Sequence, residues 1–544
     1  MIFNFSRDGL NKNEQKTQRF FEMVPGLCSW TILLGLIALS VSKPLMAALF
    51  IIAFDFFWFL RLIYMTIFLV LSYFRLSIED NVEWMDRVNA VDRLKETIKE
   101  FQIPKTLKLK QRYSTRIHRS ELLRLYKSNA LPPASKDIAH LVILPVAKES
   151  SEIVVPSIES LCTQKFPPKQ IVVMIALEDR ADQKIKDSIT KLEQQYKDTF
   201  MDFMVILHPS DLPGEKRVKG ANASWAAKKA KDYFSEKSIP FENIVVSCFD
   251  SDTIVSPQYF ACLTYYFMIT PFRTCASFQP IPVYHNNIWD VPGFARVMET
   301  GSSFFQLIES TNPEKLVTFS SHSMSFKALV DVDYWPVDMI SDDSAIFWKS
   351  FIHYDGKYRV VPMYITLSMD IIASDSIWET AKSIYKQKRR WAWGVENFPI
   401  MMRAFCSSKK ISLYDKLRYG FKLLEGHISW ATWGFILTFL SWLPAFFTNK
   451  AAETSVVYYN APYIAGTIFH LASFSLFISI ILSLMLLPKE NVRHSLLKRV
   501  AFAIQWLMIP FILVFLSALP ALDAQTRMLL GKRLDFWVAN KRKT

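Results

Sequence analysis

The chain has 544 residues, of which 51% are hydrophobic, and it carries a formal net charge of +14. This length exceeds one ordinary domain, and the hydrophobic content is typical of a protein with both soluble and membrane-spanning parts. The positive charge does not indicate nucleic-acid binding, because many of the basic residues flank long apolar segments. The six Cys residues show no paired spacing and no zinc-binding pattern, which indicates free thiols in a reducing compartment.

Apolar segments long enough to cross a membrane lie on both sides of a long soluble block. Two lie in the N-terminal region 1–76, at 23–42 and 44–74, and three lie in 401–522, at 427–447, 454–488 and 500–522. We therefore expect a multi-pass protein of the inner or plasma membrane. Basic residues before the first segment and after the fourth favour the cytoplasmic side, so the N-terminus and the soluble block are expected in the cytoplasm.

Five crossings would place the basic tail, 523–544, outside, which the same charge rule disfavours. Either one apolar segment is re-entrant, or the tail is an interfacial helix on the inner face. Within the second segment, Asp55 and Arg61 are costly in hydrocarbon and do not share a helix face. We expect Arg61 to reach toward the interface, and Asp55 to line a polar path or to find a partner on another helix.

The soluble block begins with a charged, helix-rich collar and linker, 77–138. Short apolar runs then alternate with amphipathic stretches. This pattern predicts strands at 140–145, 171–177, 203–208 and 243–249, and helices at 151–164, 181–196 and 221–234. The alternation predicts an α/β domain over 139–400, with a mainly parallel sheet covered by helices on both faces. Ligands of such sheets bind beyond the carboxyl ends of the strands, where Lys148-Glu149, Glu178-Asp179 and Asp250-Ser-Asp252 stand.

Asp250 and Asp252 directly follow the fourth predicted strand. Acid pairs often cap helices or lie in turns, but at the end of a buried strand they suit Mg2+ or Mn2+ bound to a diphosphate. Such an ion would neutralise charge on a leaving nucleoside diphosphate. Glu178 is either a cap of the next helix or a carboxylate that binds the base or ribose of a donor. The role of Asp179 is left open.

Lys219 belongs to a basic loop just before a helix, where backbone amides and basic side chains can approach phosphate. The alternative is a solvated basic loop. Asp342 and Asp343 open a later helix, and a helix cap explains one of the acids but not both. Sugar transfer with inversion requires a base that takes the proton of the attacking hydroxyl. Asp343 is the candidate base, with Asp342 as its neighbour or as an acceptor contact.

The basic stretch 381–393 contains Gln387-Lys-Arg-Arg390-Trp391. One interpretation is an amphipathic helix lying on anionic lipid. The other uses the guanidinium and the adjacent indole to bind a phosphate next to a sugar. Both hold if Gln387, Arg390 and Trp391 turn inward while Lys388 and Arg389 face lipid.

These motifs, in this order between about 141 and 391 and flanked by apolar segments, resemble membrane-integrated family 2 inverting glycosyltransferases such as cellulose, hyaluronan and chitin synthases. The resemblance implies a GT-A fold and metal-dependent hexosyl transfer, with Mg2+ or Mn2+, from a nucleotide-sugar expected to be UDP-linked. It implies a growing polysaccharide as acceptor, with export of the chain between the helices. By position it implies Asp343 as base; Glu178, Lys219, Asp250, Gln387, Arg390 and Trp391 at the donor; Asp342 and Trp391 at the acceptor; and Asp250 and Asp252 at the metal.

The same resemblance implies a role for Asn222 in the Lys219 motif, and acceptor contacts from Gln279-Pro280 and from 320–326. Two departures stand out: Ser341 and Asp342 replace Thr and Glu of the base motif, and Glu178 stands where Asp is commoner. We expect no soluble regulatory domain after the last apolar segment. Expected partners are the donor, a glycan or lipid acceptor, membrane lipids and export proteins, but no nucleic acid. The alternatives are single transfer to a lipid, as in ceramide glucosyltransferases, and a transporter or scaffold that merely binds nucleotide.

Overall fold

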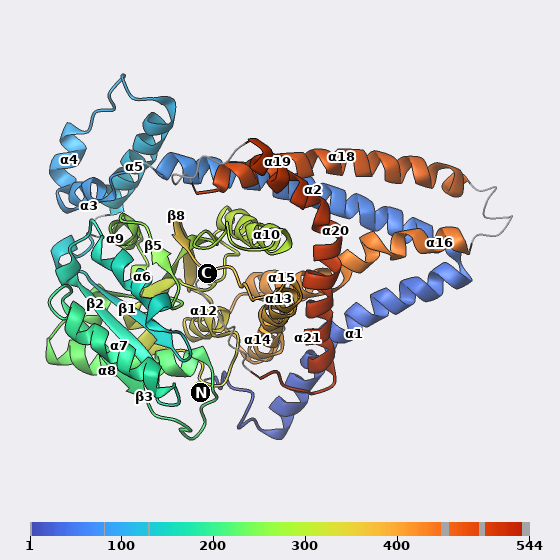
Figure 1. Ribbon diagram of the computed structural model, residues 1–544. Coiled ribbons are helices and arrows are strands. Elements are labelled where there is room, and N and C mark those ends of the chain that lie inside the picture. Colours follow the sequence, from blue (N-terminus) through green and yellow to red (C-terminus); the bar gives the residue numbers. More distant parts are fainter. Residues whose placement is uncertain (1–2, 81, 129–130, 448–455, 489–495, 536–544) are drawn as a thin grey trace.

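The computed structural model describes residues 3–80, 82–128, 131–447, 456–488 and 496–535. Its centre is one eight-stranded sheet with the strand order β3-β2-β1-β4-β7-β6-β8-β5 (Figure 1). The strands are β1 (Ala139–Val146), β2 (Ile171–Glu178), β3 (Asp202–His208), β4 (Ile244–Cys248), β5 (Ile254–Val255), β6 (Ala276–Val283), β7 (Ser323–Ser325) and β8 (Arg359–Ser368).

The sheet is mixed but mainly parallel. Strands β1, β2, β3 and β4 pair in parallel, as do β6 and β8. The short strand β7 runs antiparallel between β4 and β6, and the short strand β5 runs antiparallel to β8. Strands β6 and β8 therefore point the same way as β1 to β4, and their carboxyl ends lie at the same edge of the sheet. The four strands expected between 139 and 249 are confirmed.

Helices cover both faces of the sheet because alternate strand residues point to opposite sides. On one face, Val142 and Val173 lie in a core with residues of α6 (Ser151–Cys162), α7 (Gln183–Tyr196) and α9 (Tyr259–Ile269). On the other, Leu141 and Val172 lie in a core with residues of α8 (Lys219–Glu236), α11 (Phe326–Asp331) and α12 (Asp342–His353). Each fully buried Val or Leu contributes about 1.5–3 kcal/mol. The expected α/β fold class is confirmed.

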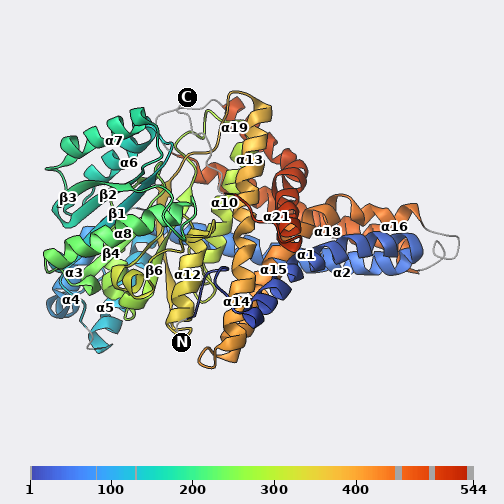
Figure 2. The same cartoon turned by 90° about the horizontal axis from the view of Figure 1, so that it is seen from below.

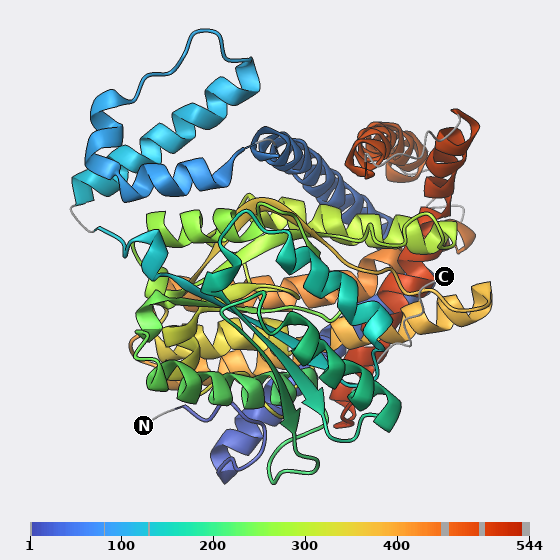
Figure 3. The same ribbon diagram turned by 60° about the vertical axis from the view of Figure 1, so that its left-hand side comes forward.

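Three helices form the region between the second apolar helix and the sheet: α3 (Trp84–Asp92), α4 (Leu94–Glu100) and α5 (Leu109–Ser128). Figure 3 shows them standing to one side of the sheet domain. Trp84 of α3 packs against Tyr265 of α9, with ring centroids 5.4 Å apart. Arg87 joins this region to the end of α2 through Glu79, with 3.0 Å between the charged groups. The charged segment is thus helical, as expected, and it contacts the sheet domain through α9.

Long apolar helices flank the sheet domain in sequence. Four have the length and hydropathy of a membrane span: α1 (Lys12–Ser42), α2 (Pro44–Glu79), Gly466–Leu486 within α18 (Val456–Leu486), and Val500–Leu529, which runs from α19 (Leu496–Gln505) through α20 (Ile509–Phe511) to α21 (Leu519–Leu529). A fifth is formed if α15 (Leu413–Thr438) and α16 (Leu443–Phe446), bent by 49° at their junction, count as one span. Figure 2 shows α1, α2, α16 and α18 extending together away from the sheet. This confirms a multi-pass membrane protein.

The two ends of the apolar region lie on the same side of it. Asp8, before α1, is 2.6 Å from Arg533, after α21. Arg19 of α1 donates a hydrogen bond of 2.8 Å to the carbonyl oxygen of Met528. Contact between the ends favours an even number of complete crossings. In Figure 1, α20 and α21 run across the direction of α1, α2 and α18, which favours the expected alternative in which one apolar segment does not cross.

Arg61 of α2 has a partner on another helix. Its guanidinium donates a hydrogen bond to Glu425 of α15 and lies 4.9 Å from the ring centroid of Trp58. An ion pair between two helices compensates the cost of both charges in an apolar region. Asp55 Oδ1 is buried and accepts no hydrogen bond from the residues that the structure describes.

Candidate active site

Two acidic site residues from distant parts of the chain meet at one lysine. The ammonium of Lys219 lies 2.8 Å from Asp250 Oδ1 and 3.0 Å from Asp343 Oδ1. Lys219 is the first residue of α8, Asp250 follows β4, and Asp343 is the second residue of α12. The structure therefore brings together the residues expected to bind the donor, to hold the metal and to act as the base.

A glycine allows this approach. Gly220 follows Lys219 at the start of α8, where a Cβ atom would lie 2.5 Å from the carbonyl oxygen of Pro336 and 2.9 Å from Cβ of Asp342. Both distances are shorter than van der Waals contact, so only glycine lets the start of α8 come this close to the start of α12. The spacing between Lys219 and Asp343 depends on that close contact.

The two adjacent acids of α12 have different surroundings. Asp342 is 2% exposed, and burial, together with the neighbouring Asp343 charge, raises its pKa to about 8. Asp343 has a side chain that is 24% exposed and already faces the Lys219 ammonium. Burial by itself lowers the pKa of Lys219, but Asp250 and Asp343 outweigh burial and keep that pKa well above its ordinary value. Asp343 is therefore the acid that a substrate can reach.

Asp250 and Asp252 are held by loops at the carboxyl edge of the sheet. Asp250 Oδ2 accepts a hydrogen bond from the Ser320 hydroxyl, and the Asp250 N–H donates to Ser321 Oγ at 3.1 Å. Asp252 Oδ2 accepts from the N–H of Asp370 at 3.0 Å, just after β8. Ser321 has a φ of +59°, a conformation that costs a non-glycine residue energy and is common at functional sites. The segment 320–326 thus contacts Asp250 through Ser320 and Ser321.

The acid pair fits a metal that is shared with a substrate. Among the residues that the structure describes, no group of three or more His, Cys, Asp or Glu side chains could hold a metal ion by itself. Asp250 and Asp252 nevertheless supply the carboxylate oxygens that Mg2+ and Mn2+ prefer, and such ions commonly take their other ligands from phosphates and water. The Lys219 ammonium on Asp250 shows that a cation is already accommodated there.

The Gln-x-x-Arg-Trp motif lies near the end of α13 (Ile377–Ala392) and approaches the same edge of the sheet. The ring of Trp391 lies 6.4 Å from that of Tyr284, the residue after β6. Burial raises the pKa of Tyr284 well above its ordinary value; the charges of Glu299, Asp250 and Asp252 add to this, while that of Arg390 opposes it. Tyr284 is therefore close to both the acid pair and Arg390. Gln387 Oε1 is buried and accepts no hydrogen bond from the described residues.

The expectation that Lys388 and Arg389 face lipid was wrong. Lys388 is 1% exposed, and its ammonium lies 2.8 Å from Glu299 and 3.5 Å from the ring centroid of Trp391. Arg389 pairs with Asp523 of α21 at 2.9 Å. Residues three apart share a helix face, so Lys388 has to point to the same side as Trp391. Helix α13 is enclosed by α10 (Gly293–Ser310) and α21 on these faces.

Glu178 stands at the carboxyl end of β2, as expected, and accepts a hydrogen bond from Arg180. Asp179 pairs with Lys186 at 2.8 Å. The N-cap residue of α7 is Asp182, so the alternative in which Glu178 caps that helix was wrong.

Other candidates have roles in holding loops and helices. Glu149 Oε2 accepts hydrogen bonds from the N–H groups of Ala147 and Lys148, which closes a turn. The amide of Asn222 donates a hydrogen bond of 2.7 Å to the carbonyl oxygen of Ala176 and so joins α8 to β2. Gln279 Oε1 accepts from the N–H of Phe319 at 2.8 Å and supports the loop that carries Ser320.

Tyr284 and Glu299 were not predicted from the sequence. Strand β6, which positions Tyr284, contains Pro280 and Pro282, and prolines argue against a strand inside a sheet. The register of β6 against β8 shifts between Gln279 and Ile281, at Pro280, whereas Pro282 pairs with Leu367. Residues 276–283 include Ser277, Gln279 and the two prolines, so they carry no clear strand signal.

Comparison with known proteins gives relatives that are polysaccharide synthases by name. No family model matches the chain. A poly-beta-1,6-N-acetyl-D-glucosamine synthase of Staphylococcus aureus (strain COL) is 26% identical over 293 residues, which cover 52% of this chain and 61% of the relative. The synthase of Staphylococcus epidermidis is 24% identical over 313 residues, 54% of this chain and 62% of the relative. The match therefore spans less than two thirds of these relatives. It confirms the expected resemblance to membrane-integrated family 2 glycosyltransferases.

Solved structures are similar only at a low level. A mannosyltransferase, PcManGT from Pyrobaculum calidifontis in complex with GDP-Man and Mn2+, is 11% identical with a TM-score of 0.40, covering 81% of this chain and 100% of that one. S. aureus TarS 1–349 in complex with UDP-GlcNAc is 13% identical with a TM-score of 0.31, covering 57% of this chain and 88% of that one. These scores are too low to inform the chemistry of the site.

Proposed function

We propose that this protein is a membrane-bound inverting glycosyltransferase that moves a hexosyl group from a UDP-linked donor to a growing polysaccharide. The observation that carries the proposal is the meeting of Asp250, Lys219 and Asp343 at the carboxyl edge of the sheet. In the proposal, residues 139–400 form the catalytic domain and the apolar helices around it anchor that domain in the membrane. The curated relatives, which are polysaccharide synthases by name, support a polymer as product.

In this proposal Asp343 takes the proton of an acceptor hydroxyl. The oxygen then attacks the anomeric carbon of the donor as the bond to the diphosphate breaks on the opposite face, and the electron pair of that bond leaves with the diphosphate. The Lys219 ammonium lies between Asp343 and Asp250, where it can stabilise negative charge on the leaving group. Mg2+ or Mn2+, held by Asp250 and Asp252, would neutralise further charge there when bound.

The remaining assignments in the proposal follow the positions of the side chains. Arg390, Gln387 and Trp391 bind the diphosphate and the adjacent sugar, and the contact of Trp391 with Tyr284, just after β6, supports this assignment. Glu178 binds the base or ribose from the end of β2. Asp342 supports Asp343 from its buried position and, with Trp391, lies at the acceptor side.

Replacing Asp343 with Asn tests the assignment of the base. Because the amide cannot accept the proton, we expect transfer to fall by about 10²–10⁴-fold while UDP binding stays within a few-fold of wild type. The assay is transfer from radiolabelled nucleotide-sugars by membranes containing the full chain, with Mg2+ or Mn2+. Turnover retained by the variant would contradict the assignment.

The length of the product separates the proposal from its alternative. A ladder of oligomers supports a polymerising enzyme, whereas one labelled glycolipid supports single transfer to lipid. Export of the chain between the helices belongs to the proposal as well, and it is tested by the protection of product inside sealed inverted vesicles.

A further inference from the structure

Glu396 joins two parts of the candidate active site through both of its carboxylate oxygens. The residue ends a short helical turn, Trp393–Glu396, that follows α13, and it is only 3% exposed. Its Oε1 accepts hydrogen bonds from the N–H of Ile340 at 3.2 Å, from the N–H of Ser341 at 3.1 Å and from the Ser341 hydroxyl at 2.8 Å. Its Oε2 accepts from the Trp393 indole N–H at 2.9 Å.

These bonds set the start of α12. Ser341 is the N-cap residue of that helix, yet its side chain accepts no hydrogen bond from the helix, and its hydroxyl donates to Glu396. Asp343 follows two residues later. Asn397 reinforces the arrangement, because its amide donates to Ser341 Oγ at 3.2 Å and to Ser344 Oγ at 3.0 Å. The position of Asp343 therefore depends on groups at the beginning of α14 (Asn397–Ser407).

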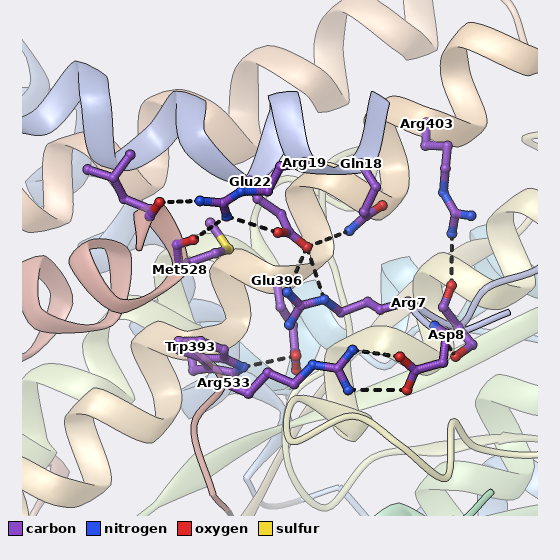
Figure 4. A network of polar contacts seen from close by, with 12 residues as sticks. Arg7, Asp8, Gln18, Arg19, Glu22, Trp393, Glu396, Arg403, Met528 and Arg533 are labelled. Carbon is purple, nitrogen blue, oxygen red and sulfur yellow. Dashed lines mark hydrogen bonds and ion pairs between the residues drawn. The ribbon is translucent and has the colours of Figure 1, made fainter. Parts of the chain in front are cut away.

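A buried carboxylate needs a nearby positive charge, and the N-terminal segment, residues 3–10, supplies one. Figure 4 shows Arg7 reaching to Glu22 of α1, with Glu396 and Trp393 beside it. Burial raises the pKa of Glu396, while the Arg7 charge and the Ser341 and Trp393 hydrogen bonds oppose that rise. Further bonds hold the segment in place: the guanidinium of Arg403 donates to the carbonyl oxygens of residues 4 and 6, at 2.8 and 3.0 Å.

We propose that Glu396 is a positioning residue for the transfer reaction, in that it fixes the base loop 340–343 to the end of the Gln-x-x-Arg-Trp helix. The inference rests on the proposed function and adds to it a residue that acts on neither donor nor acceptor. Glu396 acts through Ser341 and Trp393. It thereby sets how far the base Asp343 lies from the groups expected to hold the donor.

The expected effects follow from the lost bonds. Glu396→Ala removes every acceptor at once, and misplacing a catalytic group by about 1 Å costs about 100-fold in rate. We therefore expect kcat to fall about 100-fold, with the donor KM changed by less than about threefold because the donor-binding groups remain. Glu396→Gln keeps one acceptor oxygen for Ser341 but turns an NH2 group toward the Trp393 indole. It should recover part of the lost kcat.

The experiment uses the full chain in lipid nanodiscs with a radiolabelled UDP-sugar. Turnover by the wild type and its loss in Asp343→Asn test the proposed function by themselves. A failure of the proposed function is therefore distinguishable from a failure of the inference about Glu396. Glu79→Gln is the matched control, because Glu79 is an equally buried, hydrogen-bonded carboxylate remote from the site. Equal kcat losses in Glu396→Gln and Glu79→Gln would overturn the proposal, as would a Glu396→Ala kcat within about threefold of wild type.

A double-mutant cycle covers the case in which Glu396→Ala folds poorly. Ser341→Ala removes only one hydroxyl and should lower kcat by about tenfold in the wild-type background. In the Glu396→Gln background it should have a smaller effect, because the neutral amide oxygen accepts a weaker hydrogen bond from the Ser341 hydroxyl than the carboxylate does. Fully additive effects on kcat would show that Glu396 and Ser341 act independently, and would overturn the proposal.

Discussion

Replacing Lys219 with Met tests whether its ammonium is what lets Asp250 and Asp343 lie so close together. Met keeps an unbranched chain of similar length but carries no charge. The ammonium is 2.8 Å from Asp250 and 3.0 Å from Asp343, and the Lys219 side chain is 10% exposed. The variant therefore leaves two carboxylates facing one another across an uncharged side chain.

The magnitude follows from these distances. At an effective dielectric constant of about 20, each contact corresponds to about 6 kcal/mol of direct attraction, much of which is offset by burying the ammonium. Removing one partner of a buried pair costs about 3–5 kcal/mol, because the remaining charge is uncompensated. Asp250 and Asp343 have side chains that are 31% and 24% exposed, so water screens them partly. We therefore expect a loss of about 3 kcal/mol in the free energy of unfolding.

Divalent cations should act differently on the variant. In wild type an added metal competes with the ammonium for Asp250, whereas in Lys219→Met it meets carboxylates only, so we expect Mn2+ to bind about tenfold more tightly without nucleotide. At about 100 times its dissociation constant, the ion should restore about 2.7 kcal/mol. The assays are Mn2+ titration followed by electron paramagnetic resonance, and thermal unfolding with and without Mn2+.

An exposed lysine provides the control. Lys410 pairs with Asp355 at 2.9 Å, but its side chain is 76% exposed, so Lys410→Met should change stability by less than about 1 kcal/mol. If Lys219→Met has the stability and the Mn2+ affinity of wild type, the view that Lys219 neutralises the acid pair is wrong.

Three further changes test the packing around the site. Burial raises the pKa of Asp342 to about 8 from an ordinary 3.8, so between these values the folded protein keeps a proton that the unfolded chain releases, and the stability from this group falls as pH rises. The melting temperature of Asp342→Asn, relative to that of wild type, should therefore increase over this pH range. A difference that stays constant with pH would contradict this. Gly220→Ala should lower the free energy of unfolding by about 1–3 kcal/mol and should lower turnover, because the new Cβ would lie 2.5 Å from a carbonyl oxygen. Gly301→Ala is the control: a Cβ there would have nothing within 4 Å, so this variant should not destabilise the protein. Lys388→Met should lower the free energy of unfolding by about 3–5 kcal/mol, because it leaves Glu299 buried without its partner. Adding Glu299→Leu should restore most of this free energy, as measured by thermal unfolding. Additive losses in the double variant would refute this account of the buried pair.

The parallel half of the sheet was predictable because its strands are buried on both faces. Such strands read as continuous apolar runs, and β1, β2 and β4 consist almost entirely of buried residues. The other half gave no such signal. Strand β7 has three residues, two of them Ser, and β6 contains two prolines, so neither has the pattern of an internal strand. Their positions depend on pairing with β4 and β8, which are distant in the sequence.

The types of residue at the site were also predictable, but the role of each residue was not. Asp342 and Asp343 are identical residues side by side, and only packing makes one buried and the other accessible. Similarly, the basic residues of α13 suggested contact with lipid, yet Lys388 is enclosed with Glu299. Glu396 carries no motif at all. It became visible only because its oxygens meet backbone N–H groups of a loop more than fifty residues away.

The amino-acid sequence by itself determined where the apolar helices and buried strands lie and which acids, bases and aromatic groups are available, since these follow from local composition and periodicity. The tertiary structure alone decided which of those groups touch. The contacts of Lys219 with Asp250 and Asp343, and of Asp8 with Arg533, join residues far apart along the chain, and their distances depend on how whole helices and strands pack.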